Sequence, residues 1–89
     1  MEREAKECLR EWLENPYWCR YYEDAPSSEC REYIMYDFLY SDTEDEAVAK
    51  KLDEIESTLG VEDLKHIAKY EGNTPKGAAL RKKISEMGG

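Results

Sequence analysis

The sequence predicts an all-α fold, a single domain over residues 1–89 built as a compact bundle of about five short helices. Apolar residues recur every three or four positions, as one face of a helix requires, and no stretch alternates polarity for long enough to form a strand. The segments are separated by two to six residues, a typical spacing in helix bundles. Helices are expected at 2–14, 16–22, 28–40, 43–59 and 62–71, with 75–87 as the last, and residues 88–89 as a frayed tail.

The first two helices are expected on either side of an Asn-Pro pair. Asn15 is a good N-cap and Pro16 a good first helical residue, so one helix ends and another begins there. The segment 16–22, PYWCRYY, is short and almost entirely aromatic. The first helix presents one apolar stripe, which comprises Ala5, Cys8, Leu9, Trp12 and Leu13.

The segment 28–40 is expected to be the central helix, with Ser27 or Ser28 as its cap. It is apolar nearly all the way round, with Ile34 in the middle of one face. A helix with so wide an apolar arc belongs inside a bundle. The helical projection turns only Glu29, Glu32 and Tyr36 clearly away from that arc.

The segment 43–59 is expected to pack on one side only. Thr43 and Glu46 match the capping-box pattern, and Gly60 is the expected residue just past its end. Its apolar stripe is narrow, so its acidic faces should remain in water. The stripe comprises Val48, Leu52, Ile55 and Leu59.

The last two helices are expected to form a pair joined by a short turn. Gly72 ends the first of them, Thr74 caps the second and Pro75 opens it. In the first, His66 projects outward beside lysines. In the second, the expected apolar stripe comprises Leu80, Ile84 and Met87.

The composition predicts a small, highly charged cytoplasmic protein. The net charge is −8, with 40% hydrophobic and 38% charged residues, and no apolar run approaches the length of a membrane span. The segment MEREAKE is charged and is not expected to be a signal peptide, and three cysteines, an odd number, argue against a disulfide framework. Charge is uneven: residues 1–63 hold 19 acids and 7 bases, a net of −12, whereas residues 64–89 hold 6 bases and 2 acids, a net of +4.

No residue pattern points to a metal, a cofactor or catalysis. Cys8, Cys19 and Cys30 with His66 provide a zinc ligand set in principle, but zinc sites use paired ligands two to four residues apart, and these cysteines lie eleven apart. They are better interpreted as small buried or half-buried hydrophobes. Acidic residues are abundant without forming a recognisable dyad, so we expect a protein that is not an enzyme.

Protein–protein contact is the leading functional hypothesis, in a regulatory or accessory role. The aromatic segment 16–22 is expected mainly as core, although tyrosine, tryptophan and arginine are also the residues enriched at interface hot spots, and such rings can stack on bases. A basic or nucleic-acid-binding protein is the expected kind of partner, because the domain is strongly acidic. The candidate partner-binding residues are Asp45, Asp53, Glu56, Tyr21, Tyr22 and Tyr36.

Two alternatives involve nucleic acid. The acidic helix is a candidate DNA mimic that occupies the groove of a nucleic-acid-binding enzyme. Alternatively, residues 62–83 resemble a helix-turn-helix in outline, with Lys76, Arg81 and Lys82 offered to phosphates. The net negative charge of the chain opposes DNA binding. It therefore favours the alternative that the basic end docks internally on the acidic helix of residues 42–56. The candidate mimic residues are Asp42, Glu44, Asp45, Asp53, Glu54 and Glu56.

Overall fold

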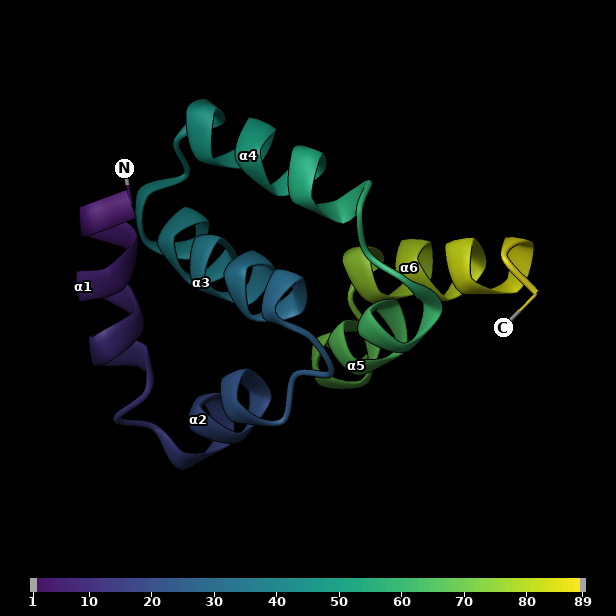
Figure 1. The fold of residues 1–89 in the computed structure, drawn as a ribbon, viewed down its shortest axis with the longest axis horizontal. Helices are drawn as coiled ribbons and strands as arrows, with labels where there is room; N and C mark the ends of the chain where they lie inside the picture. The colour runs from purple at the N-terminus through teal and green to yellow at the C-terminus, as the bar shows by residue number, and fades with distance from the viewer. Residues whose placement is uncertain (1, 89) are drawn as a thin grey trace.

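A computed structural model describes residues 2–88, which form six α-helices and no strand (Figure 1). The all-α prediction is confirmed. Each of the six segments expected to be helical forms a helix, so the expected number of about five is one too low. The helices are α1 (Glu2–Trp12), α2 (Pro16–Glu23), α3 (Ser28–Thr43), α4 (Glu46–Glu56), α5 (Val61–Glu71) and α6 (Pro75–Glu86).

Three predicted helix starts are confirmed by hydrogen bonds at their caps. The Asn15 side chain accepts a hydrogen bond from Tyr17 N at 2.9 Å, so α2 begins at Pro16. Ser27 accepts from a backbone N–H in the first turn of α3, and Thr74 does the same in α6. Each side chain satisfies an amide that has no partner inside its helix.

The junction between α3 and α4 differs from the prediction. Thr43 is the last residue of α3, because its hydroxyl donates to the Leu39 carbonyl at 2.9 Å instead of capping α4. Glu44 then adopts a left-handed conformation with φ of 50°, and Asp45 caps α4 by accepting from Ala47 N at 2.9 Å. The predicted capping box at Thr43 is therefore wrong.

The end of α4 also differs from the prediction. The helix ends at Glu56, so Leu59 is buried from the turn that follows. Gly60 is the N-cap of α5 with extended φ and ψ, and its N–H donates to the Asp63 carboxylate at 3.0 Å. The expected position of Gly60 directly after the end of α4 is therefore wrong, because Gly60 begins the next helix.

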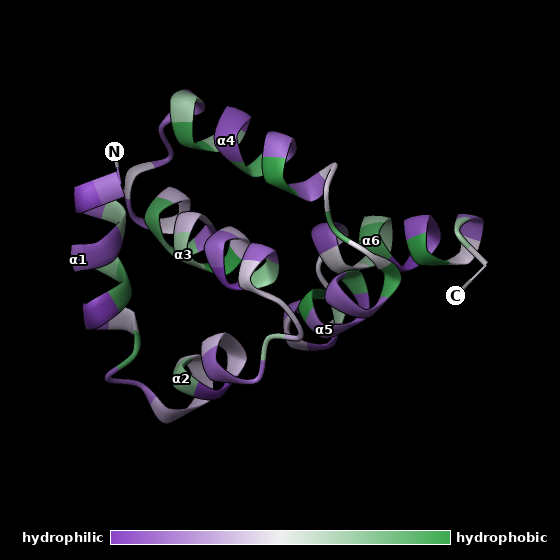
Figure 2. Ribbon diagram, viewed as in Figure 1, coloured by the Kyte–Doolittle hydropathy of each residue, from purple (hydrophilic) through white to green (hydrophobic). Residues whose placement is uncertain are grey.

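Helix α3 lies at the centre of the bundle, as predicted. It packs against α1 and α4, and α2 contacts it as well, below it in the view of Figure 1. Ile34 is fully buried, and the apolar edge of α4 faces α3 (Figure 2). The buried residues of α3 are Cys30, Tyr33, Ile34, Tyr36, Phe38 and Leu39.

Helices α5 and α6 form a closely packed pair beside one end of the bundle (Figure 1). Leu80 and Ile84 are buried as predicted, whereas Met87 is 45% exposed because α6 extends beyond its neighbours. Of the expected tail, Gly89 lies outside the described residues, and Gly88 N donates to Ser85 O at 3.1 Å. Among residues 2–88, no helix is long and apolar enough to cross a membrane.

Candidate protein-binding surfaces

Tyr21 belongs to the core, as expected for most of the segment 16–22, so its candidate role as an exposed partner-binding residue is wrong. Only 1% of it is accessible, and its ring stacks on Tyr70 with centroids 4.8 Å apart. Its hydroxyl has no hydrogen-bond partner in the part of the chain that is described. Burial is the main reason that its pKa is raised far above the usual range, so the phenol stays neutral.

His66 closes the other side of this ring cluster, so the prediction that it faces solvent is wrong. It is half-buried, and its Nε2 lies 2.7 Å from the carbonyl oxygen of Tyr21. Because a carbonyl oxygen only accepts hydrogen bonds, Nε2 is the nitrogen that donates here. The imidazole therefore ties α5 to α2 and contacts the rings of Tyr21 and Tyr70.

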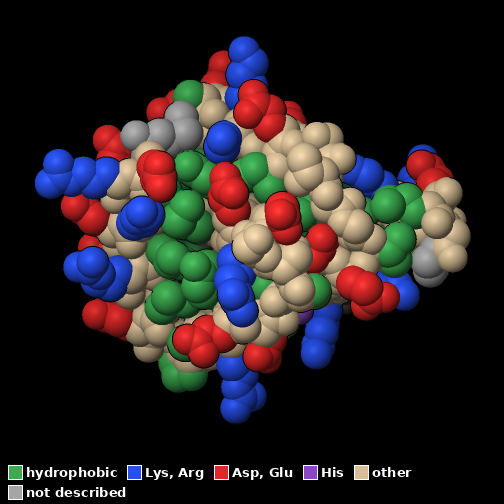
Figure 3. Space-filling view, in the orientation of Figure 1, with side chains coloured by type: hydrophobic (Ala, Val, Ile, Leu, Met, Phe, Trp, Pro, Cys, Tyr) green, Lys and Arg blue, Asp and Glu red, His purple; other side chains and the backbone are tan. Residues whose placement is uncertain are grey.

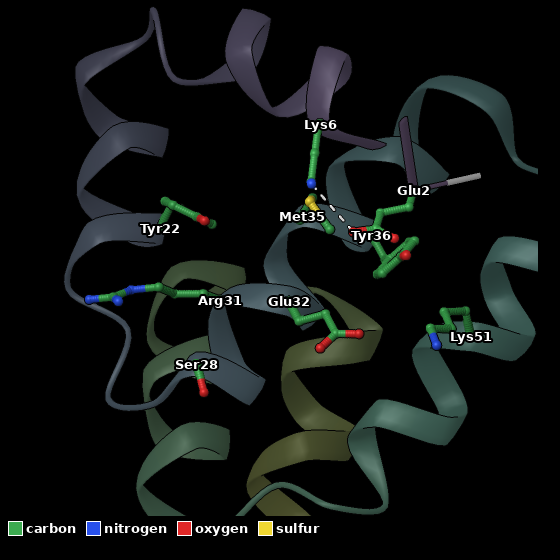
Figure 4. A pocket seen from close by; sticks show the side chains of 9 residues that line it. All are labelled: Glu2, Lys6, Tyr22, Ser28, Arg31, Glu32, Met35, Tyr36 and Lys51. Carbon is green, nitrogen blue, oxygen red and sulfur yellow. Dashed lines mark ion pairs between the residues drawn. The ribbon is translucent and has the colours of Figure 1, made fainter. Parts of the chain in front are cut away.

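The other two candidate tyrosines, Tyr22 and Tyr36, come together at a hollow over α3 (Figure 4). The hollow has a volume of about 420 Å³ and lies between α1, α3 and α4, with the end of α2 at its edge. We call it the α3 hollow. Its lining residues are Glu2, Lys6, Tyr22, Ser28, Arg31, Glu32, Met35, Tyr36 and Lys51.

Tyr36 lies in the floor of the α3 hollow and is only 5% exposed, so its predicted outward position is wrong. The Lys51 side chain from α4 reaches over its ring, with Nζ 5.8 Å from the ring centroid. Tyr22 is half-buried at the opposite edge. Of the three candidate tyrosines, Tyr22 is therefore the one most accessible to a partner.

Charged groups of both signs surround the apolar floor of the α3 hollow. Lys6 and Glu2 form an ion pair of 3.3 Å at one edge (Figure 4). Arg31, Glu32 and Lys51 stand at the other edges. Figure 3 shows hydrophobic side chains gathered between α1 and α3, with acidic and basic groups around them.

The three candidate acids of the 43–59 segment have different surroundings. Asp53 is exposed on α4, without a hydrogen bond or ion pair from its side chain within residues 2–88. Asp45 is also exposed, but it caps α4. Glu56 is half-buried, and its carboxylate lies 4.0 Å from Lys83 Nζ on α6. Two of the three therefore have a structural role.

The three candidate nucleic-acid-binding residues do not form one surface. Lys76 turns inward, where its Nζ lies 2.8 Å from Asp37 Oδ1 and 4.8 Å from the centroid of the Tyr33 ring. Arg81 donates to the Gly72 carbonyl at 2.8 Å, and Lys82 is exposed. Helix α6 packs chiefly on α5, and within residues 2–88 the basic end makes one ion pair with α3, through Lys76, and one with the acidic α4, through Lys83.

The three cysteines lie apart from one another and differ in burial. Cys8 and Cys30 are buried and Cys19 is half-buried, as predicted. Burial raises the pKa of Cys8 and of Cys30 to about 12, and the acceptor Asp42 adds to the rise at Cys8. Within residues 2–88 there is no group of three or more His, Cys, Asp or Glu side chains that could hold a metal ion.

Several residues of these surfaces could not be predicted from the sequence. Met35, Arg31 and Lys51 line the α3 hollow, and Asp37 is the partner of Lys76. The one available signal is the wide apolar arc of α3, which exceeds what one neighbouring helix can cover. The pairing of Asp37 with Lys76 spans 39 residues and leaves no local trace in the sequence.

No protein-family model matches the chain, and neither a curated protein nor a solved structure matches it.

Proposed function

We propose that this chain is a small non-enzymatic domain that acts by protein–protein contact, in a regulatory or accessory role. The α3 hollow is the observation that carries the proposal. Its floor, with Met35 and Tyr36, is apolar, and Tyr22 and charged side chains stand at its edges, the arrangement of an interface with an apolar centre and a polar rim. Tyrosine, methionine and arginine are also the residue types enriched in such interfaces.

The surroundings of the reactive side chains support a non-enzymatic role. Nucleophilic catalysis by cysteine requires a thiolate, whereas burial keeps Cys8 and Cys30 protonated near neutral pH. His66, the only histidine, donates its Nε2–H to the backbone carbonyl of Tyr21. A reducing cytoplasm suits these thiols and is the compartment that we propose.

A basic protein is the partner class that the charge favours. A net charge of −8 attracts a cationic surface and raises its association rate. The DNA-mimic alternative is a special case, in which the basic surface is a phosphate-binding groove that takes exposed acids such as Asp53 and Glu54. Binding of DNA by residues 62–83 is less favoured, because Lys76 is already paired with Asp37.

The test is affinity capture from the native cell extract with matched baits, read by mass spectrometry. The baits are the wild type, Arg31→Glu with Tyr22→Ala in the α3 hollow, and Arg10→Glu, an exposed charge reversal on α1 outside the hollow. We expect one or a few partners that Arg10→Glu retains and the hollow variant loses.

Two results contradict the proposal. The first is a set of partners that the hollow variant retains in full. The second is a salt-dependent gel shift of duplex DNA at 150 mM salt that Arg81→Ala with Lys82→Ala abolishes. That second result would make the helix-turn-helix-like alternative the better account.

A further inference from the structure

A second recess lies on the side of α3 that faces away from the α3 hollow. It consists of two adjoining hollows of about 390 and 270 Å³, both of which are lined by Trp12 and Trp18. Asp37 of α3 lines this recess. It is turned about 100° around the helix axis from Tyr36 and about 200° from Met35, which both line the α3 hollow. We call this recess the tryptophan groove. The side chains that matter to the inference are Trp12, Trp18, Glu11, Asp37, Asp42 and Glu71.

The aromatic wall of the tryptophan groove is held by contacts on several sides. Trp12 stacks on Phe38 with centroids 4.6 Å apart and planes within 8°. Trp18 meets Trp12 edge-on at 5.5 Å. The Trp12 indole N–H donates to Asp42 Oδ2 at 3.2 Å, which fixes the ring orientation. Both indoles remain half-exposed, so a ligand meets rings that are already in place.

Acids outnumber bases in the tryptophan groove. Glu11, Asp37, Asp42 and Glu71 line it with Lys76 as the one cation, and Lys76 is paired with Asp37. Within residues 2–88, no ion pair of 4.0 Å or less involves Glu11, Asp42 or Glu71. Burial raises the pKa of Glu71, although Lys76 and the Thr74 hydroxyl act against the rise. A cation bound in the groove would therefore stabilise the carboxylates of Glu11, Asp42 and Glu71, which have no ion-pair partner within residues 2–88.

We propose that the tryptophan groove binds arginine side chains of a basic protein segment. A guanidinium is planar, so it can lie against an indole while its N–H groups reach a carboxylate. The groove offers both kinds of group, because Asp42 is hydrogen-bonded to Trp12 and Glu11 lines the same hollow as Trp18. The net charge of −8 attracts the same ligand from a distance. The inference rests on the proposed function, because its occupant is a segment of a protein partner.

The chain contains only two tryptophans, and both line this groove, so intrinsic fluorescence reports directly on its occupancy. The probe is a blocked hexa-arginine peptide, titrated at 150 mM salt, with hexa-lysine and hexa-glutamate peptides as comparisons. We expect a saturable change in tryptophan emission with arginine and weaker binding with lysine, which lacks the planar fork. No change is expected with glutamate. A signal that never saturates, or equal affinity for all three peptides, overturns the proposal.

A matched pair of variants separates the groove from general attraction. Glu11→Gln with Glu71→Gln removes two charges from the groove, whereas Asp53→Asn with Glu54→Gln removes two charges from the exposed face of α4. We expect the first pair to weaken arginine binding at least tenfold and the second less than threefold. Equal weakening contradicts the proposal, because it would mean that the peptide binds diffusely.

Further measurements keep the result interpretable. Circular dichroism checks that each variant is folded, and if the groove pair does not fold, the exposed Glu11→Gln alone is expected to weaken binding at least threefold. No loss in that variant overturns the inference. If peptide binding fails while the α3 hollow variant loses its partners, the groove is wrong and the proposed function survives. If arginine binds but the hollow variant captures every partner, the proposed use of the α3 hollow is wrong.

Discussion

The ammonium nitrogen of Lys76 lies 2.8 Å from Asp37 Oδ1 and joins the last helix to the central one. Burial alone lowers the pKa of Lys76, but the Asp37 carboxylate and Tyr33 together outweigh burial, so the pKa is raised and the lysine remains charged. The ring of Tyr33 lies beneath the same ammonium group. The basic end of this acidic protein is thus partly a structural cation.

Replacing Lys76 tests this interpretation. Lys76→Met keeps the apolar stem but leaves the Asp37 carboxylate, whose side chain is only 15% exposed, without its cation. We expect the free energy of unfolding to fall by about 2 kcal/mol, as measured by urea denaturation. The control Lys82→Met is exposed and should change stability by less than about 0.5 kcal/mol. Similar values for the two variants would mean that the pair contributes little.

Ile34 should be among the costliest residues to truncate. It is fully buried in the central helix, so Ile34→Ala removes apolar contacts and leaves a cavity that costs about 2–5 kcal/mol. Val48→Ala removes fewer methyl groups from α4, which packs on one side only, and should cost less. Chemical denaturation of both variants gives the comparison, and small, equal losses would show that α3 is not the centre of stability.

Replacing Gly77 by alanine should lower the stability of the fold, the opposite of the usual effect of this change inside a helix. Gly-to-Ala changes inside helices usually stabilise by up to about 1 kcal/mol. At Gly77, however, a Cβ would lie 2.5 Å from the Gly72 carbonyl oxygen and 3.3 Å from Glu71 Cβ. We therefore expect Gly77→Ala to lower the melting temperature, because α6 must move away from the turn before it. An increase in melting temperature would show that the turn adapts easily.

Alkaline pH should destabilise the fold before it affects the salt-bridged lysine. The pKa values of Cys8, Cys30 and Tyr33 are all raised to about 12, chiefly by burial. Above the unfolded-state pKa of each group the native state holds the extra proton. The stability that each buried group contributes is therefore fully present below its unfolded-state pKa and is lost as pH rises toward its folded-state pKa of about 12.

The loss per group approaches about 1.4 kcal/mol per pH unit between the unfolded and folded pKa values. Urea denaturation at pH 8, 9 and 10 measures it. The double variant Cys8→Ala with Cys30→Ala is less stable at pH 8, but its stability should decline less steeply with pH. Parallel declines for the variant and the wild type would show that the thiols are not the groups that titrate.

Local signals in the sequence predicted most of the helices and their starts. Asn15, Ser27 and Thr74 act on amides within three residues of themselves, so their capping role is visible without knowing the fold. Thr43 was wrongly predicted as a cap, because its hydroxyl donates instead to the carbonyl of Leu39, four residues back. Gly60 failed in a similar way, because a glycine between two helices can end the first or begin the second.

The surfaces were harder to predict than the helices. A helical projection shows which side of a helix is apolar but not which neighbour covers the rest, and so Tyr36 was placed outward although Lys51 covers it. The burial of Tyr21 agrees with the mainly core expectation for 16–22, but its contacts with Tyr70 and His66 of α5 could not be predicted. The pairing of Lys76 with Asp37 depends on two helices that are far apart in the sequence. Such contacts are products of the tertiary fold, which no local pattern records.

The order in which the helices pack also has a kinetic consequence. The most extensive contacts join α5 to α6, α3 to α4 and α1 to α3, so each helix docks mainly on a neighbour that is near in sequence. Closing such short loops costs little chain entropy, and helical proteins of this kind fold in microseconds to milliseconds. Stopped-flow or temperature-jump refolding should therefore show a main phase within milliseconds, whose rate falls when Ile34 is truncated if the α3 contacts form before the rate-limiting barrier.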